Sequence, residues 1–292
     1  IDLHIPINSN LIGEVKNSDL TISKIRGTIA LKTESTDSEL DNMSGDINLS
    51  TRGGNISTNK LSGNLELAVI SGDINIFDCN ANTVTTIDNG NILINGMKGN
   101  LKSNTTLGES LITNFEGENC VFNINVGNLK VNECISNLNA NIDIGSISIS
   151  NLQGSVSLFT GKGEINLNNI IGGVNCNTNF GNVNGSNLFG RVNANSELGD
   201  IVINKGYNSF LNDHSINLIT QRGSITIRLP SELPYAINSQ CNNLETRSAI
   251  SSEIPLEEEF LAAKVIAQGK IKEGTISCNL SSNYGPISIY TN

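Results

Sequence analysis

The stretch Ser71-Gly72-Asp73-Ile74-Asn75-Ile76 decides the fold, because the chain repeats its pattern many times. A glycine recurs every nine residues, with one residue inserted after the ninth position, in the series Gly45, Gly54, Gly63, Gly72, Ala81, Gly90, Gly99, Gly108, Gly117, Gly127, Ser136, Gly145, Gly154, Gly163, Gly172, Gly181, Gly190 and Gly199. Only two of these eighteen positions are not glycine. Such a fixed period predicts a repeat architecture.

Each glycine is followed by a short alternation of apolar and polar residues, as in Gly145-Ser146-Ile147-Ser148-Ile149. Alternation with a period of two is typical of a strand with one buried face. Glycine suits a corner where a Cβ would clash or φ must become positive. A nonapeptide is too short for a helical crossover, so parallel strands require the chain to coil.

Two kinds of nonapeptide alternate, which makes the true period eighteen residues. In one kind, the residue two before the corner is apolar; in the other it is usually polar. We therefore predict an all-β fold, a parallel β-helix or β-solenoid with about 18 residues per coil, stacked roughly 4.8 Å apart. Right-handed coiling is favoured because parallel crossovers usually have that hand. The sequence leaves open whether each coil has two or three sides. One inward column is predicted from Ile56, Ile74, Ile92, Ser110, Leu129, Ile147, Ile165, Val183 and Ile201.

We expect one domain over residues 1–292. Residues 1–42 supply N-terminal strands and first coils, 43–228 the regular coils, and 229–292 irregular coils and a C-terminal cap. The inserted residue predicts a bulged corner near Asn119–Asn125. Within the cap, Pro255–Gln268 carries three glutamates before Lys264, a charge order that suits a short helix. A strand over Ala263–Ala267 is the alternative.

The charge balance narrows the range of partners. The net charge is −10 and the isoelectric point is near 4.7, so a phosphate backbone would be repelled. Nucleic-acid binding is not expected. Apolar runs are too short for a membrane span, so no membrane insertion is expected in this segment.

Residues for catalysis are sparse. The two histidines, His4 and His214, are far apart and neither belongs to a sequence cluster. Asp88 and Asp143 occupy like positions but lie three coils apart, roughly 14 Å by strand spacing, too far for a pair of catalytic carboxylates. We predict no catalytic, cofactor-binding or metal-binding residue, and no cofactor.

Calcium rolls are a second possibility for nonapeptide coils, since their repeat carries an aspartate in every turn. Here aspartate follows the corner glycine only at Asp46, Asp73 and Asp200. The first two fall on unlike half-coils and do not stack, so a calcium array is not expected. The outward positions are mostly Asn, Ser, Asp and Glu, which predicts a solvated sheet face, with a flat platform for glycan or protein as the functional alternative.

Three of the six cysteines, Cys79, Cys134 and Cys176, fall on inward positions. Cys79 and Cys134 lie three coils apart, beyond the Cα separation that a disulfide spans. We interpret these residues as buried thiols that act as small hydrophobic side chains.

Cys120 is predicted to face outward, and pairing of Cys241 with Cys278 beside the cap is left open. Unpaired thiols favour a reducing, intracellular compartment, with the cell surface or secretion as the alternative.

The chain resembles the adhesin family of β-solenoid domains of unknown function, which is bacterial with some eukaryotic intracellular relatives. The resemblance rests on an opening strand and turn, a repeated S-G-D-I-x-I core and a closing strand. These are Ile5-Pro6-Ile7-Asn8-Ser9-Asn10-Leu11, Ser44-Gly45-Asp46-Ile47-Asn48-Leu49, Ser71-Gly72-Asp73-Ile74-Asn75-Ile76, Leu229-Pro230-Ser231-Glu232-Leu233 and Gly285-Pro286-Ile287-Ser288-Ile289. The resemblance covers essentially the whole chain and implies the solenoid fold; it carries over no catalytic residues.

The resulting functional hypothesis is a non-catalytic module, structural or macromolecule-binding and adhesin-like, with an unidentified protein or glycan as partner. A flat face with an aromatic or apolar patch would favour it. One alternative is a carbohydrate-active β-helix enzyme, a lyase or hydrolase, which needs a groove with two carboxylates about 5–10 Å apart. The other is a scaffold that polymerises end to end, which needs an uncapped terminal coil.

Overall fold

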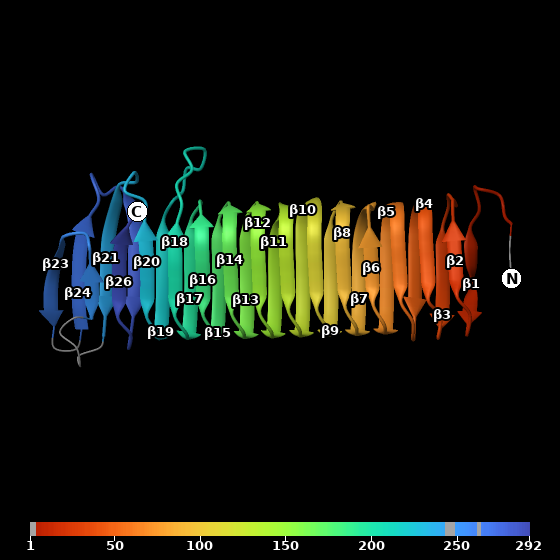
Figure 1. The fold of residues 1–292 in the computed structure, drawn as a ribbon, viewed down its shortest axis with the longest axis horizontal. Coiled ribbons are helices and arrows are strands. Elements are labelled where there is room, and N and C mark those ends of the chain that lie inside the picture. The colour runs from red at the N-terminus through yellow and green to blue at the C-terminus, as the bar shows by residue number, and fades with distance from the viewer. Residues whose placement is uncertain (1–3, 243–248, 262–263) are drawn as a thin grey trace. The chain divides into compact units, whose positions relative to one another are not determined.

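The computed structural model describes residues 4–242, 249–261 and 264–292. These residues form an all-β solenoid of about 11 turns, with about 18 residues per coil and no helix. Contacts divide the chain into two compact units, Ile1–Ile142 and Asp143–Asn292. Within each unit, parallel strands of successive coils lie side by side (Figure 1). The predicted fold class is confirmed.

The first unit contains the strands β1 to β10, and β11 passes its boundary. Their bounds are β1 (Leu11–Lys16), β2 (Leu20–Ser23), β3 (Ile29–Glu34), β4 (Ser38–Thr51), β5 (Ile56–Ser71), β6 (Ile74–Phe77), β7 (Asn80–Asn89), β8 (Ile92–Lys98), β9 (Leu101–Leu107), β10 (Ser110–Val126) and β11 (Leu129–Ile144). Strand β5 pairs with β6 through Ile56–Asn59 and with β7 through Ser62–Ser71. One turn of chain thus supplies two strand segments, so each regular coil is two-sided.

A left-handed backbone residue makes the two sides of each coil unlike. It lies three residues before alternate corners, with φ between 49° and 57°, at Asn42, Lys60, Asp78, Asn114, Glu133, Asn151, Asn169 and Asn187. This residue interrupts the alternation, so the apolar residue after it points inward. Cys79, for example, follows Asp78 and is 1% exposed. Asparagine is common here because it adopts left-handed φ more readily than most residues.

The corners bring the backbones of successive coils too close for side chains. Gly63 has φ of 120°, and a Cβ at this position would overlap the carbonyl oxygen of Gly45 in the coil before it. Ala81 lies in register with Gly63 and is outside the set of residues with positive φ. Alanine is therefore tolerated at that one corner.

The predicted aliphatic column is confirmed, since each of its nine members is at most 1% exposed. Ile56, Ile74 and Ile92 pair in register on consecutive coils, and Ile147 pairs with Ile165 in the second unit. Burial of each such side chain contributes about 1.5–3 kcal/mol before the loss of conformational entropy.

The inserted residue is Glu118, one position before the predicted range. Ser110–Glu116 pair with residues 18 positions earlier, whereas Cys120–Val126 pair with residues 19 earlier. Gly117 still stacks on Gly99, so the extra residue follows it directly. The shift reverses which later residues face inward. The prediction that Cys120 faces outward is therefore wrong: Cys120 pairs with Leu101 and is 0% exposed.

The second unit contains the remaining strands. Their bounds are β12 (Ile147–Gln153), β13 (Val156–Lys162), β14 (Ile165–Ile171), β15 (Val174–Phe180), β16 (Val183–Leu188), β17 (Val192–Leu198), β18 (Ile201–Lys205), β19 (Ile216–Arg222), β20 (Ile225–Leu229), β21 (Tyr235–Cys241), β22 (Ile250–Ser252), β23 (Leu256–Leu261), β24 (Lys264–Lys270), β25 (Ile276–Ser282) and β26 (Ile287–Thr291). One side runs β13–β15–β17–β19–β25–β21–β24–β23 and the other β12–β14–β16–β18–β20–β26–β22.

The last coil in the sequence is not the last in space. Strand β25 lies between β19 and β21, and β26 lies between β20 and β22. The chain therefore forms the outer strands β21 and β22 first. It then returns and places β25 and β26 between these strands and the preceding coil. Strand β26 confirms the closing strand expected after Gly285, but the pairing order of β25 and β26 does not follow the sequence.

The predicted helix within Pro255–Gln268 is wrong. Strand β23 pairs antiparallel with β24, and β24 pairs antiparallel with β21. The alternation of buried Val265 and Ala267 favours a strand that covers the sheet edge. The alternative strand is confirmed for residues 264–267, while Ala263 lies outside the described residues. The three glutamates lie on exposed β23, where charge opposes further pairing.

A column of buried hydroxyl groups satisfies the corner carbonyls of the second unit. Each hydroxyl donates to the glycine carbonyl of the preceding coil, as Thr160 to Gly145 (2.8 Å), Thr178 to Gly163 (3.2 Å), Ser196 to Gly181 (3.0 Å), Thr220 to Gly199 (3.0 Å) and Ser282 to Gly223 (3.0 Å). Buried carbonyls without a partner are costly, so this column stabilises the corners.

Candidate functional site

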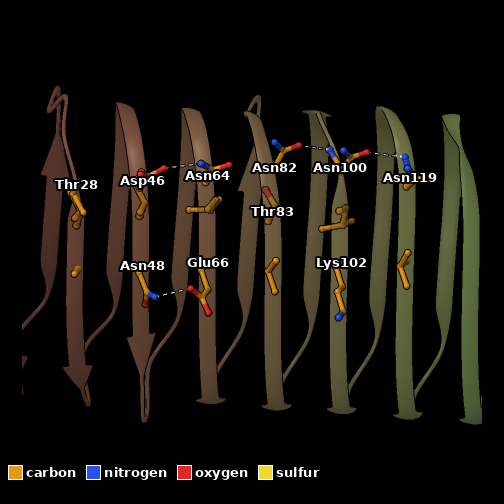
Figure 2. Close-up of a pocket in the computed structure, with 17 residues that line it drawn as sticks. Thr28, Asp46, Asn48, Asn64, Glu66, Asn82, Thr83, Asn100, Lys102 and Asn119 are labelled. Carbon is orange, nitrogen blue, oxygen red and sulfur yellow. Dashed lines mark hydrogen bonds between the residues drawn. The ribbon is translucent and has the colours of Figure 1, made fainter.

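The polar face of the first unit carries a shallow groove of about 790 Å³, shown in Figure 2. Two rows of outward side chains line it, one and three residues after successive corners, or two and four at the last coil because of the inserted Glu118. The first row is Thr28, Asp46, Asn64, Asn82, Asn100 and Asn119, and the second is Ala30, Asn48, Glu66, Val84, Lys102 and Val121. The predicted polar sheet face is present here, with Ala30, Val84 and Val121 as its apolar members.

Two carboxylates lie in this groove. Asp46 accepts a hydrogen bond from the Asn64 amide (2.7 Å), and Glu66 accepts one from the Asn48 amide (2.8 Å) (Figure 2). Their backbones are one strand and two residues apart, about 8 Å from strand geometry. Side chains on backbones at this spacing are able to bring their carboxyl groups within the roughly 5–9.5 Å that glycosidases use. Both side chains are exposed, whereas a general acid is usually shielded from water.

Residues directly after the corners cap the backbone of the next coil. The Asp73 carboxylate accepts the amide of Asn91 (2.7 Å), and the Asn91 side chain accepts the amide of Glu109 (2.9 Å). Asp200 likewise accepts the amide of Ser224 (2.7 Å). The aspartates considered above as calcium ligands therefore have structural partners. Among the residues that the structure describes, no three His, Cys, Asp or Glu side chains gather to hold a metal ion.

The second unit has a groove of about 440 Å³ on the side formed by β12, β14, β16, β18 and β20. Its floor is mainly serine and asparagine. The Asn184 amide donates to Asn166 (2.9 Å), and the Ser186 hydroxyl donates to Asn168 (2.8 Å). At one end the guanidinium of Arg228 lies 4.8 Å from the ring centre of Tyr290.

An exposed stripe of apolar, aromatic and cationic residues crosses the other side of the second unit. It comprises Lys162, Phe180, Leu198, Arg222 and Tyr284, each one residue before a corner glycine. The first four are in register on β13, β15, β17 and β19. Phe180 is 49% exposed, Leu198 38% and Tyr284 65%. We call these five residues the corner stripe.

Cation–aromatic contacts order the corner stripe. The ammonium of Lys162 lies 5.9 Å from the centre of the Phe180 ring, and the guanidinium of Arg222 lies 5.7 Å from that of Tyr284. The two kinds of nonapeptide differ in the residue two positions before each corner glycine, whereas the residues of the corner stripe stand one position before it. A comparison of this second position from coil to coil reveals the apolar and aromatic residues of the corner stripe in the sequence.

All six cysteines are free and buried. Burial raises the pKa of Cys134, Cys176 and Cys278 to about 12. Cys278 is in register with Ile237, four residues before Cys241, so those two thiols are about 13 Å apart along the strands. The pairing that the sequence left open does not occur.

His4 is exposed and His214 is 5% exposed. His214 nevertheless lies beside an aromatic and a basic residue, Tyr207 and Lys205, where the insertion meets the coils. Its ring centre lies 5.8 Å from that of Tyr207, and the charge of Lys205, together with burial, lowers its pKa. No pattern in the sequence indicates this cluster, because it forms around an insertion in the repeat.

The described part of the chain contains no helix of the length and apolar character that a membrane crossing requires. Comparison of the chain with family models, curated proteins and solved structures gives no match.

Proposed function

We propose that the chain is a non-catalytic binding module that contacts a protein partner through the corner stripe. The observation that carries this proposal is the run of Phe180, Leu198 and Tyr284 exposed beside two cations. Aromatic residues and arginine are enriched in protein interfaces and dominate their binding energy. A soluble surface gains nothing from such a stripe unless a partner covers it. The resemblance to the adhesin family is consistent with this role and remains a prediction.

The structure offers little support for end-to-end polymerisation at the C-terminal side. The outermost strand there, β23, is antiparallel to its neighbour and exposes Glu257, Glu258 and Glu259. Like charges repel when two such edges meet. We therefore favour a lateral contact through the corner stripe.

The test is affinity capture from the native organism, with quantitative mass spectrometry, using three forms of the protein. The stripe variant carries Phe180→Ser, Leu198→Ser and Tyr284→Ser. The control variant carries Asn175→Ser, Asn193→Ser and Asn217→Ser on the same side of the unit. Loss of one hot-spot aromatic costs about 2 kcal/mol, or roughly 30-fold in affinity.

We expect the wild type and the control to retain the same protein and the stripe variant to lose it. Equal retention by the stripe variant, with its melting curve unchanged, contradicts the proposal. Retention of a glycan in place of a protein also contradicts it.

A second candidate function rests on the groove of the first unit. Asp46 and Glu66 have a separation compatible with glycoside hydrolysis. If this groove is an active site, the wild type releases reducing ends from a panel of polysaccharides, and Asp46→Asn and Glu66→Gln abolish the release. Glu39→Gln, an exposed carboxylate on the opposite side, is the control. Absence of release from the wild type across the panel removes this candidate.

A further inference from the structure

The solenoid of the second unit contains one long insertion among its regular coils. The corner glycine Gly223 follows the corner glycine Gly199 by 24 residues instead of 18. The backbone amide of Ser224 still donates a hydrogen bond to the carboxylate of Asp200 in the coil before the insertion. The additional residues form a loop, residues 206–215, between β18 and β19. It projects beyond the strand ends (Figure 1). We call this segment the insertion loop.

A lysine lies at the base of the insertion loop, in an inward position that holds apolar residues in the regular coils. Lys205 pairs in register with Leu188 and is 1% exposed. Its ammonium nitrogen donates to the carbonyl oxygens of Leu188 (2.9 Å) and Gly206 (3.3 Å). No carboxylate among the described residues forms a salt bridge with it.

A buried histidine closes the other end of the insertion loop. The Nδ1 atom of His214 is buried without a hydrogen-bond partner among the described residues. The carbonyl oxygen of His214 accepts a hydrogen bond from the hydroxyl of Tyr235 on β21 (3.3 Å). Tyr207 packs against the ring from within the loop. Two basic side chains are thus enclosed where the loop meets the coils.

We propose that Lys205 and His214 form a pH-sensitive latch, which holds the insertion loop against the solenoid when both are uncharged and releases it when they are protonated. Burying an ammonium or imidazolium ion without a paired carboxylate is costly. Released from the coil, both side chains would reach water. The exposed Phe210 at 92% and Tyr207 at 46% would move with the loop, so the latch controls where these aromatic residues are presented.

The charged groups around the pair set the pH range. Burial lowers the pKa of Lys205 from 10.5 to about 7, against the opposing effect of Asp213. Burial and the charge of Lys205 lower the pKa of His214 below its usual 6.5, against the opposing effect of backbone hydrogen bonds at Phe189, Leu211 and Asn208. Asp213 is held by Ser215, with Arg191 at the start of β17 nearby, and Tyr235 faces the pair from β21.

The direction of the effect follows from proton binding. Between pH 10.5 and 7, the released loop binds a proton at Lys205 that the held loop does not bind. The held loop therefore becomes less stable relative to the released loop as pH falls through this window. The ratio of released to held loop rises by up to about tenfold per pH unit. Below pH 7, Lys205 is protonated in both states, so it no longer changes the ratio of released to held loop. Below pH 6.5, the released loop binds a proton at His214 more readily than the held loop does, so the ratio rises further.

The test is amide hydrogen exchange of the full chain at Gly206, whose amide donates to Leu188 in the held state (2.9 Å). Protection factors are corrected for the intrinsic pH dependence of exchange. We expect protection in the wild type to fall by up to about tenfold per unit between pH 9 and 7. Lys205→Met keeps the length of the side chain and should abolish this slope. Lys270→Met, at an exposed lysine of the same unit that lies outside the corner stripe, should retain it.

A flat protection factor in the wild type, or an unchanged slope in Lys205→Met, overturns the proposal. Should Lys205→Met not fold, the NMR titration of the Lys205 ammonium in the wild type decides the matter. A midpoint near 7 together with the sloping protection factor supports the latch. A midpoint near 10.5 overturns it.

Discussion

At the residue scale, the fold depends on positions where only a few side chains fit. Corner glycines permit close approach of successive coils, and left-handed residues such as Asp78 and Asn151 turn the following side chain inward. Asparagine and aspartate also cap the next coil, as Asp73 does for Asn91. The high asparagine content is therefore explained by backbone geometry and capping.

The substitution Gly63→Ala tests the corner requirement. A Cβ there would overlap the Gly45 carbonyl at a φ of 120°. We expect a loss of about 2 kcal/mol or more in the free energy of unfolding, measured by urea denaturation. Ala81→Gly, in the same column, is the control and should change stability by about 1 kcal/mol or less. Equal effects of the two variants would contradict the steric explanation.

The buried thiols give a second prediction at this scale. Because burial raises the pKa of Cys134, Cys176 and Cys278 to about 12, hardly any thiolate exists at pH 8. Ellman's reagent should label none of the six cysteines in the native protein and all six in denaturant. Rapid labelling of Cys120 in the native state would show that it faces outward after all.

At the element scale, the regular coils were predictable because their period fixes which residue faces inward. The column from Ile56 to Ile201 followed from that period alone. The position of Cys120 did not, because a shift of one residue at Glu118 reverses which of the later side chains face inward. The helix prediction failed because glutamates suit both a helix start and a protected edge strand.

The candidate sites were harder to predict than the coils. Four members of the corner stripe are the last residues of β13, β15, β17 and β19, where the strand alternation ends and two consecutive side chains are exposed or half-buried. The contacts of Lys205 and His214 depend on an insertion that breaks the period. Strand β25 pairs with β19 and β21. The alternation of apolar and polar residues is similar in many strands of the chain, so it does not predict which strands become neighbours.

Removal of residues 274–292 tests the inserted coil. Strands β25 and β26 are the only parallel partners that join β21 and β22 to the preceding coil in the described residues. We expect hydrogen exchange of β21 and β24 to become rapid while β13 and β15 remain protected. Removal of Thr291 and Asn292 alone is the control. Retained protection of β21 in the larger truncation would contradict the assigned order.

At the scale of the whole molecule, the chain combines a net charge of −10 with contacts that are mostly between neighbouring coils. Stability in such proteins accumulates coil by coil. The coils leave mostly polar faces, on which the two grooves described above are shallow. The two proposals concern the ends of the repeated strands, at the corner stripe, and a loop that interrupts the repeat, at the insertion loop.

The central claim is that each residue lies beside the residue about 18 positions away. Disulfide trapping tests it most directly, with cysteines placed at exposed Asn48 and Glu66, which pair in register on β4 and β5. Their expected spacing of about 4.8 Å allows a disulfide. We predict that Asn48→Cys/Glu66→Cys cross-links under mild oxidation, as seen by mass spectrometry of unreduced peptides. Asn48→Cys/Ser57→Cys, nine residues apart, should not. The reverse result would contradict the account.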